Sequence, residues 1–217
     1  MFDVQSARRQ MIEQQVRAWD VLDLRVLEAM ERVPREAFVP EAFRDLAFAD
    51  MNVPLGEGQS MLAPKVEGRI LQSLDIAPAD RALEVGTGSG YFAACLGQLA
   101  RSVTSLEIRP TLAQAATANL RRTAGHNITV EVMDAMTITA DGEYDVIALT
   151  ASLPVYDPCF ERALRIGGRL FVVVGPEPVM EARKITRAGH GEWLTESLFE
   201  TVMDPLDHAP TPPRFVF

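Results

Sequence analysis

The sequence has little of what several classes of protein require. It contains two cysteines, Cys95 and Cys159, and three widely separated histidines, so we expect neither a disulfide framework nor a metal centre. No apolar run approaches the roughly 20 residues of a membrane span. The N-terminus "MFDVQSARRQ" also lacks the apolar core of a secretion signal. Free thiols suit a reducing compartment, and we therefore expect a cytoplasmic protein with no membrane partner.

Basic residues are also fewer than acidic ones. The 21 lysines and arginines face 30 acidic residues, which gives a formal charge of -9. A protein that grips nucleic acid through its phosphates needs clustered Lys and Arg to displace counterions, so we expect no nucleic-acid partner. The hydrophobic fraction of 47% is that of an ordinary globular protein, and 217 residues suit one sizeable core with an appended piece.

The first fifty residues have a helical pattern. Ile12, Val16 and Trp19 recur at helical spacing, and "DLRVLEAMERVP" predicts a helix that is capped by Asp23 and stopped by Pro34. A further helix is predicted to begin at Pro64, because the fixed φ of proline favours the first helical turn. We therefore divide the chain into a helical extension with a loop, residues 1–63, and a main domain, residues 64–217, that together form one structural unit.

From residue 81 onward, short apolar strands alternate with helices. The segments "RALEVG", "SVTSLEI", "ITVEVM", "YDVIALT" and "GRLFVVVG" have strand character, and helical stretches separate most of them. This alternation predicts an α/β fold with a parallel sheet covered on both faces. Two later strand-like runs, "EARKITRAG" and "ESLFETVMDPL", flank the turn "HGEW" and predict an antiparallel end. The proline-rich tail "HAPTPPRFVF" is expected to be either disordered or docked as an extended segment.

A glycine-rich turn joins the first of these strands to a helix. In "LEVGTGSGY" the glycines are Gly86, Gly88 and Gly90, and Tyr91 stands where the dinucleotide fingerprint would place a third glycine. GxGxG is the spacing of enzymes that depend on S-adenosylmethionine (SAM). A nicotinamide-dependent oxidoreductase is the alternative interpretation of the same turn.

Two acidic residues follow the next two strands. Glu107 ends its strand nineteen residues after Gly88, where a carboxylate can accept hydrogen bonds from both ribose hydroxyls. Asp134 ends the third strand and could accept from an adenine amino group. Open α/β sheets bind ligands at the carboxyl ends of their parallel strands, so the glycine turn and both carboxylates are expected to converge on one nucleoside.

The stretch "GEGQSMLAP" fits neither the helical nor the strand period. Its two glycines, its amide and its hydroxyl precede the apolar pair Met61 and Leu62, and Pro64 closes it. We interpret it as a shaped loop directly before the cofactor strand.

These motifs together resemble the protein-L-isoaspartate O-methyltransferase family across nearly the whole chain. The resemblance is carried by "RRQMIEQQVRAWDVLDLRVLEAMERVPREAFVP", "DMNVPLGEGQSMLAP", "LEVGTGSGYFAACLGQLA", "YDVIALTASLP", "LRIGGRLFVVVG" and, as the final strand, "VMDPL". It implies a doubly wound, seven-stranded, mostly parallel Rossmann-like sheet with an antiparallel end. It also implies SAM-dependent methylation of isoaspartyl carboxyl groups in damaged proteins, with S-adenosylhomocysteine as the other product.

The resemblance also implies roles for particular residues. Gly86, Gly88 and Gly90 would border SAM, Glu107 would hold its ribose, and Asp134 with Ala135 would flank the adenine. The loop residues Gln59, Ser60 and Leu62 would cover the methyl group and meet the substrate, and no metal is implied.

Two positions depart from the family pattern. The family usually has Asp-Gly where this chain has Asp134-Ala135, and the serine regarded as the family's active-site hydroxyl corresponds to Leu62. Ser60 could supply the missing hydroxyl and act as the catalytic residue. Alternatively, the more apolar pocket accepts another carboxylate or hydroxyl, or the protein binds SAM and a partner without turnover.

Overall fold

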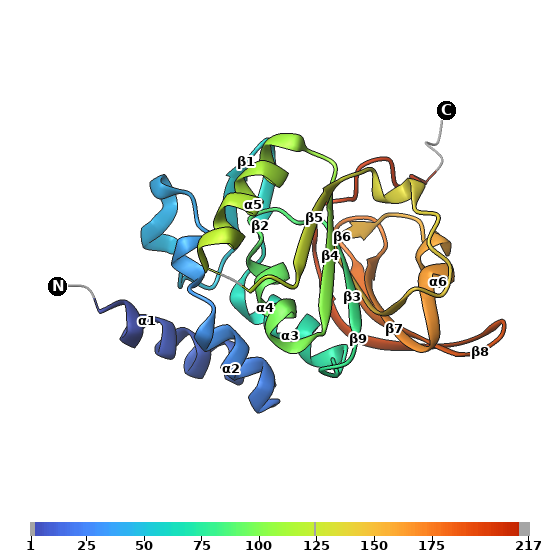
Figure 1. The fold of residues 1–217 in the computed structure, drawn as a ribbon, viewed down its shortest axis with the longest axis horizontal. Helices are drawn as coiled ribbons and strands as arrows, with labels where there is room; N and C mark the ends of the chain where they lie inside the picture. The colour runs from blue at the N-terminus through green and yellow to red at the C-terminus, as the bar shows by residue number, and fades with distance from the viewer. Residues whose placement is uncertain (1–2, 124, 213–217) are drawn as a thin grey trace.

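The computed structural model describes residues 3–123 and 125–212, so the last five residues of the tail lie outside it. Figure 1 shows the N-terminal helices on one side of a twisted sheet and the long hairpin near the C-terminus on the other. None of the helices within these described ranges is long and apolar enough to cross a bilayer.

The N-terminal extension is helical, as its periodicity predicts. The elements are α1 (Val4–Met11), a wider π-helical turn (Ile12–Val16), a 3-10 turn (Arg17–Trp19), α2 (Leu24–Arg32) and two further 3-10 turns (Arg35–Ala37 and Glu41–Leu46). Helix α2 begins where Asp23 accepts a hydrogen bond from the backbone N–H of Arg25 at 2.9 Å, which satisfies one of the donors left free at a helix start.

The segment before the main sheet contains a small hairpin. Strands β1 (Val53–Gly56) and β2 (Gln59–Met61) pair antiparallel, and the turn between them has positive φ at Gly56, Glu57 and Gly58. The irregular stretch in the sequence is therefore an ordered hairpin tip and its return strand. Helix α3 (Pro64–Ser73) follows with Pro64 in its first turn, as predicted.

The main sheet has seven strands in the order β5-β4-β3-β6-β7-β8-β9. They are β3 (Arg81–Val85), β4 (Ser102–Glu107), β5 (Ile128–Val132), β6 (Tyr144–Leu153), β7 (Leu164–Val174), β8 (Met180–Gly189) and β9 (Glu192–Thr201). The first five strands are mutually parallel, and β8 and β9 form the antiparallel end. The predicted fold class is confirmed.

Alternate residues of the central strands enter two separate hydrophobic clusters. Ala82 and Val146 belong to one cluster, and their neighbours Leu83 and Ile147 belong to the other. This alternation places one cluster on each face of the sheet, because successive side chains of a strand point to opposite faces. Helices α3, α4 (Tyr91–Leu99) and α5 (Pro110–Thr123) cover one face, and α6 (Cys159–Ala163) covers the other.

The N-terminal helices share the first of these clusters with the sheet. Met11 and Met30 from the extension pack in one core with Phe92 of α4 and Phe171 of β7. The apolar face of the extension is thus buried against the main fold. The boundary at residue 63 stays a prediction.

Two details of the C-terminal third differ from the sequence prediction. The segment "VMDPL" is not the final strand: β9 ends at Thr201, and Pro205 forms only an isolated bridge with Ser152. Proline has no N–H for a strand ladder, and the segment pairs with β6 at this one position. Helix α6 has only five residues and is shorter than the stretch "YDPCFERALRI" that predicts it.

Candidate functional site

A cleft of about 590 Å³, including its mouth, lies at the carboxyl edge of the parallel strands. The chain runs from β3 outward to β5 and then returns to the other side of β3 as β6, so the strand order reverses at β3. Ligands of open α/β sheets bind at this kind of reversal. The lining residues are Gln59, Ser60, Val85, Gly86, Gly88, Leu106, Glu107, Ile108, Arg109, Leu112, Met133, Asp134, Ala135, Thr150, Ala151, Pro205, Leu206 and Asp207.

The turn after β3 brings the backbone to the floor of the cleft. Gly86 has a φ of +97°, and a Cβ at this position would lie 2.6 Å from Thr150 Oγ1, which itself donates to the Gly86 carbonyl at 2.7 Å. A side chain there would be excluded by both the conformation and the space. The floor is therefore bare backbone that a ligand can approach.

Gly90 lies apart from this floor. It is the N-cap of α4 with a φ of +85°, and a Cβ there would meet Leu120 at 3.2 Å and Ala116 at 3.3 Å on helix α5. Its missing side chain permits close packing of α4 against α5. The structure thus gives Gly90 a packing role and places Gly86 and Gly88 on the cleft wall.

Glu107 is held at the end of β4 by the backbone. Its Oε2 accepts from the N–H of Gly88 at 2.9 Å, and its Oε1 accepts from the N–H of Arg109 at 3.0 Å. The side chain is buried at 5% exposure and lines the cleft. Each carboxylate oxygen keeps a free lone pair, so the group can still accept from two vicinal hydroxyls.

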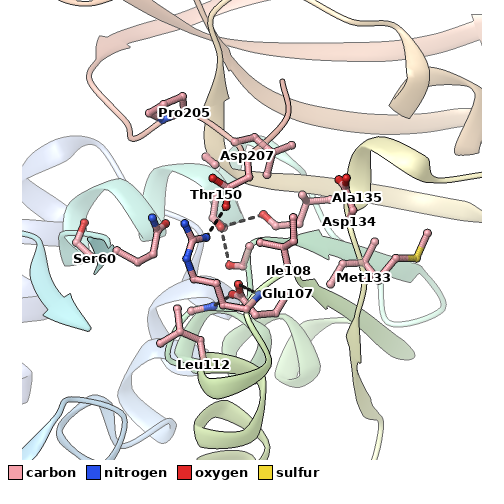
Figure 2. A pocket seen from close by; sticks show the side chains of 18 residues that line it. Ser60, Glu107, Ile108, Leu112, Met133, Asp134, Ala135, Thr150, Pro205 and Asp207 are labelled. Carbon is pink, nitrogen blue, oxygen red and sulfur yellow. Dashed lines mark hydrogen bonds and ion pairs between the residues drawn. The ribbon is translucent and has the colours of Figure 1, made fainter. Parts of the chain in front are cut away.

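Asp134 and Ala135 lie at the far end of the same cleft, as Figure 2 shows. Asp134 Oδ1 accepts from the N–H of Met136 at 3.0 Å, which fixes the carboxylate at the start of a short 3-10 turn. Its Oδ2 lies 2.7 Å from Nδ1 of His208, a partner that the sequence did not suggest. The hydrogen bond to Asp134 raises the pKa of His208, because the carboxylate favours the charged imidazole.

A smaller cavity of about 300 Å³ adjoins the cleft on the side of the loop. Ser60, Gly86, Gly88 and Thr150 line both spaces, and the inner one is also lined by Leu62 and Glu84. Glu84 is fully buried. Its Oε2 accepts from Ser105 Oγ, and its Oε1 is buried without a hydrogen-bond partner among the described residues.

The unpaired oxygen of Glu84 indicates which kind of ligand group the inner cavity suits. Burial raises the pKa of Glu84 to about 8, although its bond from Ser105 lowers it. A buried carboxylate without a partner is costly, and a cation in the cavity would relieve that cost. Sequence reasoning missed this residue. An acidic side chain inside the apolar strand "RALEVG", two positions before the first glycine, is the feature that could have revealed it.

Arg35 anchors the segment of residues 59–62, which lines both spaces. Arg35 is fully buried and donates to the Leu62 carbonyl at 2.6 Å and to the Ala47 carbonyl at 2.8 Å. Its guanidinium also pairs with the buried Glu67. The position of residues 59–62 is thereby tied to the N-terminal extension and to α3.

The mouth of the cleft is crossed by ion pairs that sequence reasoning also missed. Arg109 donates to Asp207 at 2.6 Å and lies 3.7 Å from Glu57 in the β1–β2 turn. Figure 2 shows Asp207 and Pro205 above the cleft and Leu112 below it. Across residues 3–123 and 125–212 no three His, Cys, Asp or Glu side chains are grouped as a metal site.

The fold and this geometry define a class of protein. The glycine turn and Glu107 suit an adenosine, and the adjoining cavity suits an ammonium group, because one oxygen of Glu84 has no hydrogen-bond partner there among the described residues. SAM carries both an adenosine and an α-ammonium group. The residues present therefore fit the SAM-dependent methyltransferases.

Comparison with known proteins identifies the family within that class. Residues 6–208 match the family described as protein-L-isoaspartate(D-aspartate) O-methyltransferase, and the chain belongs to it. A protein-L-isoaspartate O-methyltransferase of Rhodopseudomonas palustris is 39% identical over 198 residues, which cover 90% of this chain and 91% of the relative. One from a Roseiflexus species is 37% identical over 216 residues and covers 98% of each chain.

A solved structure has the same fold. The chain aligns with a Plasmodium falciparum protein, described as a protein-L-isoaspartate O-methyltransferase in complex with S-adenosyl-L-homocysteine, at a TM-score of 0.81. The alignment covers 92% of this chain and 98% of that one at 20% identity, and it shows the shared fold.

Proposed function

We propose that this protein transfers a methyl group from SAM to the carboxyl group of L-isoaspartyl residues in damaged proteins. Family membership supports the reaction. The observation that carries the proposal is the junction of the two cavities, where Ser60 lies between the cleft and the space that holds Glu84.

The two cavities would each hold one part of SAM. The cleft suits the adenosine, with Glu107 accepting from the ribose hydroxyls and Asp134 and Ala135 beside the adenine. The inner cavity suits the amino-acid part, with the carboxylate of Glu84 opposite its ammonium group. Gly86 and Gly88 would let the ligand lie against the backbone between them.

The reaction requires no proton transfer by the protein. SAM supplies the methyl group: a carboxylate oxygen bonds to the methyl carbon while the carbon–sulfur bond breaks, and S-adenosylhomocysteine leaves. A carboxyl group with a pKa near ~3.9 is already ionised at neutral pH, so the protein needs no general base. Its work is to hold the acceptor in line and to keep water out, and positioning of this kind lowers barriers by several kcal/mol.

The loop residues divide that work. Ser60 is half-buried at the junction and can donate its hydroxyl to the acceptor carboxylate. Leu62 is buried and lines the inner cavity, where it excludes water and offers no hydrogen bond. We therefore assign to Ser60 the donor role that belongs to another position of the loop in the family. Gln59 lines the cleft beside it.

A cytoplasmic location is part of the same proposal. Cys95 and Cys159 are both buried free thiols, which suits a reducing compartment. The partners are then cytoplasmic proteins and peptides that carry isoaspartyl residues.

Labelled SAM and two peptides that differ only in isoaspartate against aspartate test the proposal. We expect label in the isoaspartyl peptide and none in its aspartyl twin. If SAM binds and the isoaspartyl peptide gains no label, the proposed reaction is wrong. Transfer to small carboxylates or hydroxyl compounds would then point to the other acceptors that Leu62 leaves open.

A further inference from the structure

A carboxylate from the C-terminal segment faces the acceptor end of the site. Ser60 Oγ donates to Asp204 Oδ2 at 3.4 Å, although the two residues are 144 positions apart. Asp204 is exposed, so the charge lies where a substrate would arrive rather than within the core.

The backbone around Asp204 is fixed by one fully buried residue. The N–H of Ser152 donates to the carbonyl of Asp204 at 2.9 Å, and its hydroxyl donates to the carbonyl of Met203 at 2.9 Å. The carbonyl of Ser152 accepts from the N–H of Leu206 at 2.8 Å. Asp204 is therefore held at the end of β6 by three hydrogen bonds, and only its side chain is free to turn.

The cations near this end are already engaged. Among the described residues that line the two cavities, Arg109 is the one cation, and it pairs with Asp207 and lies near Glu57. An acceptor carboxylate that takes the hydroxyl of Ser60 would therefore lie beside the negative charge of Asp204. Like charges at such short range repel strongly wherever water is partly excluded.

The chemistry gives Asp204 no proton to remove. The methyl acceptor is ionised before it binds, so a second carboxylate at this place acts through its charge. A cationic group carried by the substrate would turn that charge from a penalty into an attraction.

We propose that Asp204 is a specificity-determining residue that selects isoaspartyl substrates with a Lys or Arg side chain next to the methyl-accepting residue. The inference rests on the proposed function and adds a substrate class to it. Selection arises because the ammonium or guanidinium group pairs with Asp204, and Ser60 then donates to the acceptor. A neutral neighbour leaves the repulsion in place, and an acidic neighbour adds to it.

Three isoaspartyl peptides that differ at one neighbouring position, Lys, Gln or Glu, test this inference. For the natural protein we expect kcat/KM to fall by about tenfold from Lys to Gln and again from Gln to Glu at low salt. Asp204→Asn should compress the whole series to within about threefold, and added salt should compress the natural series because the charges are exposed. Fluorescence anisotropy of the same peptides, with S-adenosylhomocysteine present, should give the same order of affinities without turnover.

The matched control is Asp141→Asn. Asp141 is exposed and lies before β6, at the opposite edge of the sheet, so the same loss of charge there should leave the spread of kcat/KM across the three peptides unchanged. An unchanged spread in Asp204→Asn would overturn the inference, as would a variant that only weakens SAM binding. Equal rates on all three peptides with the natural protein would reject the inference alone. Absence of methylation on any of them would instead reject the proposed function, and the anisotropy series would still measure the selection.

Discussion

At the scale of single residues, the chemistry of the site depends on groups whose surroundings set their charge. Glu84 is buried, and one of its oxygens has no hydrogen-bond partner among the described residues. This burial raises its pKa to about 8. The same carboxyl group has an ordinary pKa near 4.5. The folded protein thus holds this proton more tightly than the unfolded chain does.

The stability of the folded protein should therefore fall as the pH rises through the raised pKa of Glu84. The contribution of a group whose folded pKa is raised is fully present below the unfolded value near 4.5, and it is lost as pH rises through about 8. We expect the Tm of the ligand-free protein to decrease from pH 5 to pH 8 and to decrease less in Glu84→Gln. Glu67 titrates in the same direction, with a pKa raised to about 7 by burial, so the difference between the two proteins is the quantity to measure. If Tm decreases equally with pH in both proteins, the raised pKa does not belong to Glu84.

The same residue predicts how SAM binding depends on pH. Glu84 must be ionised to face an ammonium group, so affinity should increase from pH 6 to pH 7.5, where an α-amino group of pKa ~7.7 is still mostly charged. Titration calorimetry should show this trend in the natural protein. In Glu84→Gln the trend should be lost and the binding weaker by about tenfold, or ~1.4 kcal/mol.

The hydroxyl of Ser60 can be tested by removing it and by moving it. Ser60→Ala should lower kcat/KM for an isoaspartyl peptide by about tenfold, the value of one hydrogen bond to a charged group, with the KM for SAM unchanged. Adding Leu62→Ser to that variant returns a hydroxyl to the loop and should recover part of the rate. If Ser60→Ala is as fast as the natural protein, the donor role of Ser60 is wrong.

At the level of helices and strands, the segment of residues 59–62 before α3 keeps its position only because other elements hold it. Residues 59–61 form the return strand of a short hairpin, and the carbonyl of Leu62, the next residue, is fixed by Arg35 from the N-terminal extension. The helices of that extension could be predicted from their caps and periodicity. Their role in holding residues 59–62 could not be predicted, because the hydrogen bond from Arg35 to the Leu62 carbonyl spans 27 positions and does not follow from any periodic pattern in the sequence.

Exchanging the buried pair for apolar residues separates stability from positioning. Arg35→Met leaves Glu67 without its partner and should lower the free energy of unfolding by about 3 kcal/mol. The double variant Arg35→Met with Glu67→Met should recover most of that stability, measured by urea unfolding. Both variants should keep a kcat/KM about tenfold below that of the natural protein, because the Leu62 carbonyl has lost its donor.

The pair between Arg8 and Glu36 is a matched control. It is a partly buried ion pair of the same extension with an N–O distance of 2.6 Å, and across residues 3–123 and 125–212 neither side chain hydrogen-bonds residues 59–62. Its double exchange to Met should change stability and leave kcat/KM unchanged. Full activity in the Arg35 and Glu67 double variant would show that Arg35 only stabilises the fold.

At the scale of the whole molecule, the site is closed by segments that are distant in sequence. Glu107 ends β4 and Asp134 follows the end of β5 by two residues, and both could be predicted because parallel strands end at one edge. Another wall comes from residues 205–207, which follow the last strand and have neither the helical nor the strand period. Arg109 and Asp207 are 98 positions apart, and their pairing follows from the tertiary fold alone.

Ligand binding should stabilise this assembled cleft as a unit. A ligand at a hundred times its Kd adds about 2.7 kcal/mol to the stability of the folded state. For a chain of this size that corresponds to a rise in Tm of about 5–10 °C. We expect this rise with SAM and with S-adenosylhomocysteine and none with NAD. A rise in Tm with NAD alone would instead indicate a nicotinamide-dependent oxidoreductase, the alternative that the glycine turn also allows.

We expect this cleft to deliver a methyl group to an isoaspartyl carboxylate and to no other acceptor. One peptide that contains both an isoaspartyl and an ordinary aspartyl residue tests it most directly, because both acceptors meet the enzyme at the same concentration. After incubation with SAM, fragmentation mass spectrometry should locate the added methyl group on the isoaspartyl residue. A methyl group on the ordinary aspartyl residue, or on neither residue while SAM binds, would show that the proposed reaction is wrong.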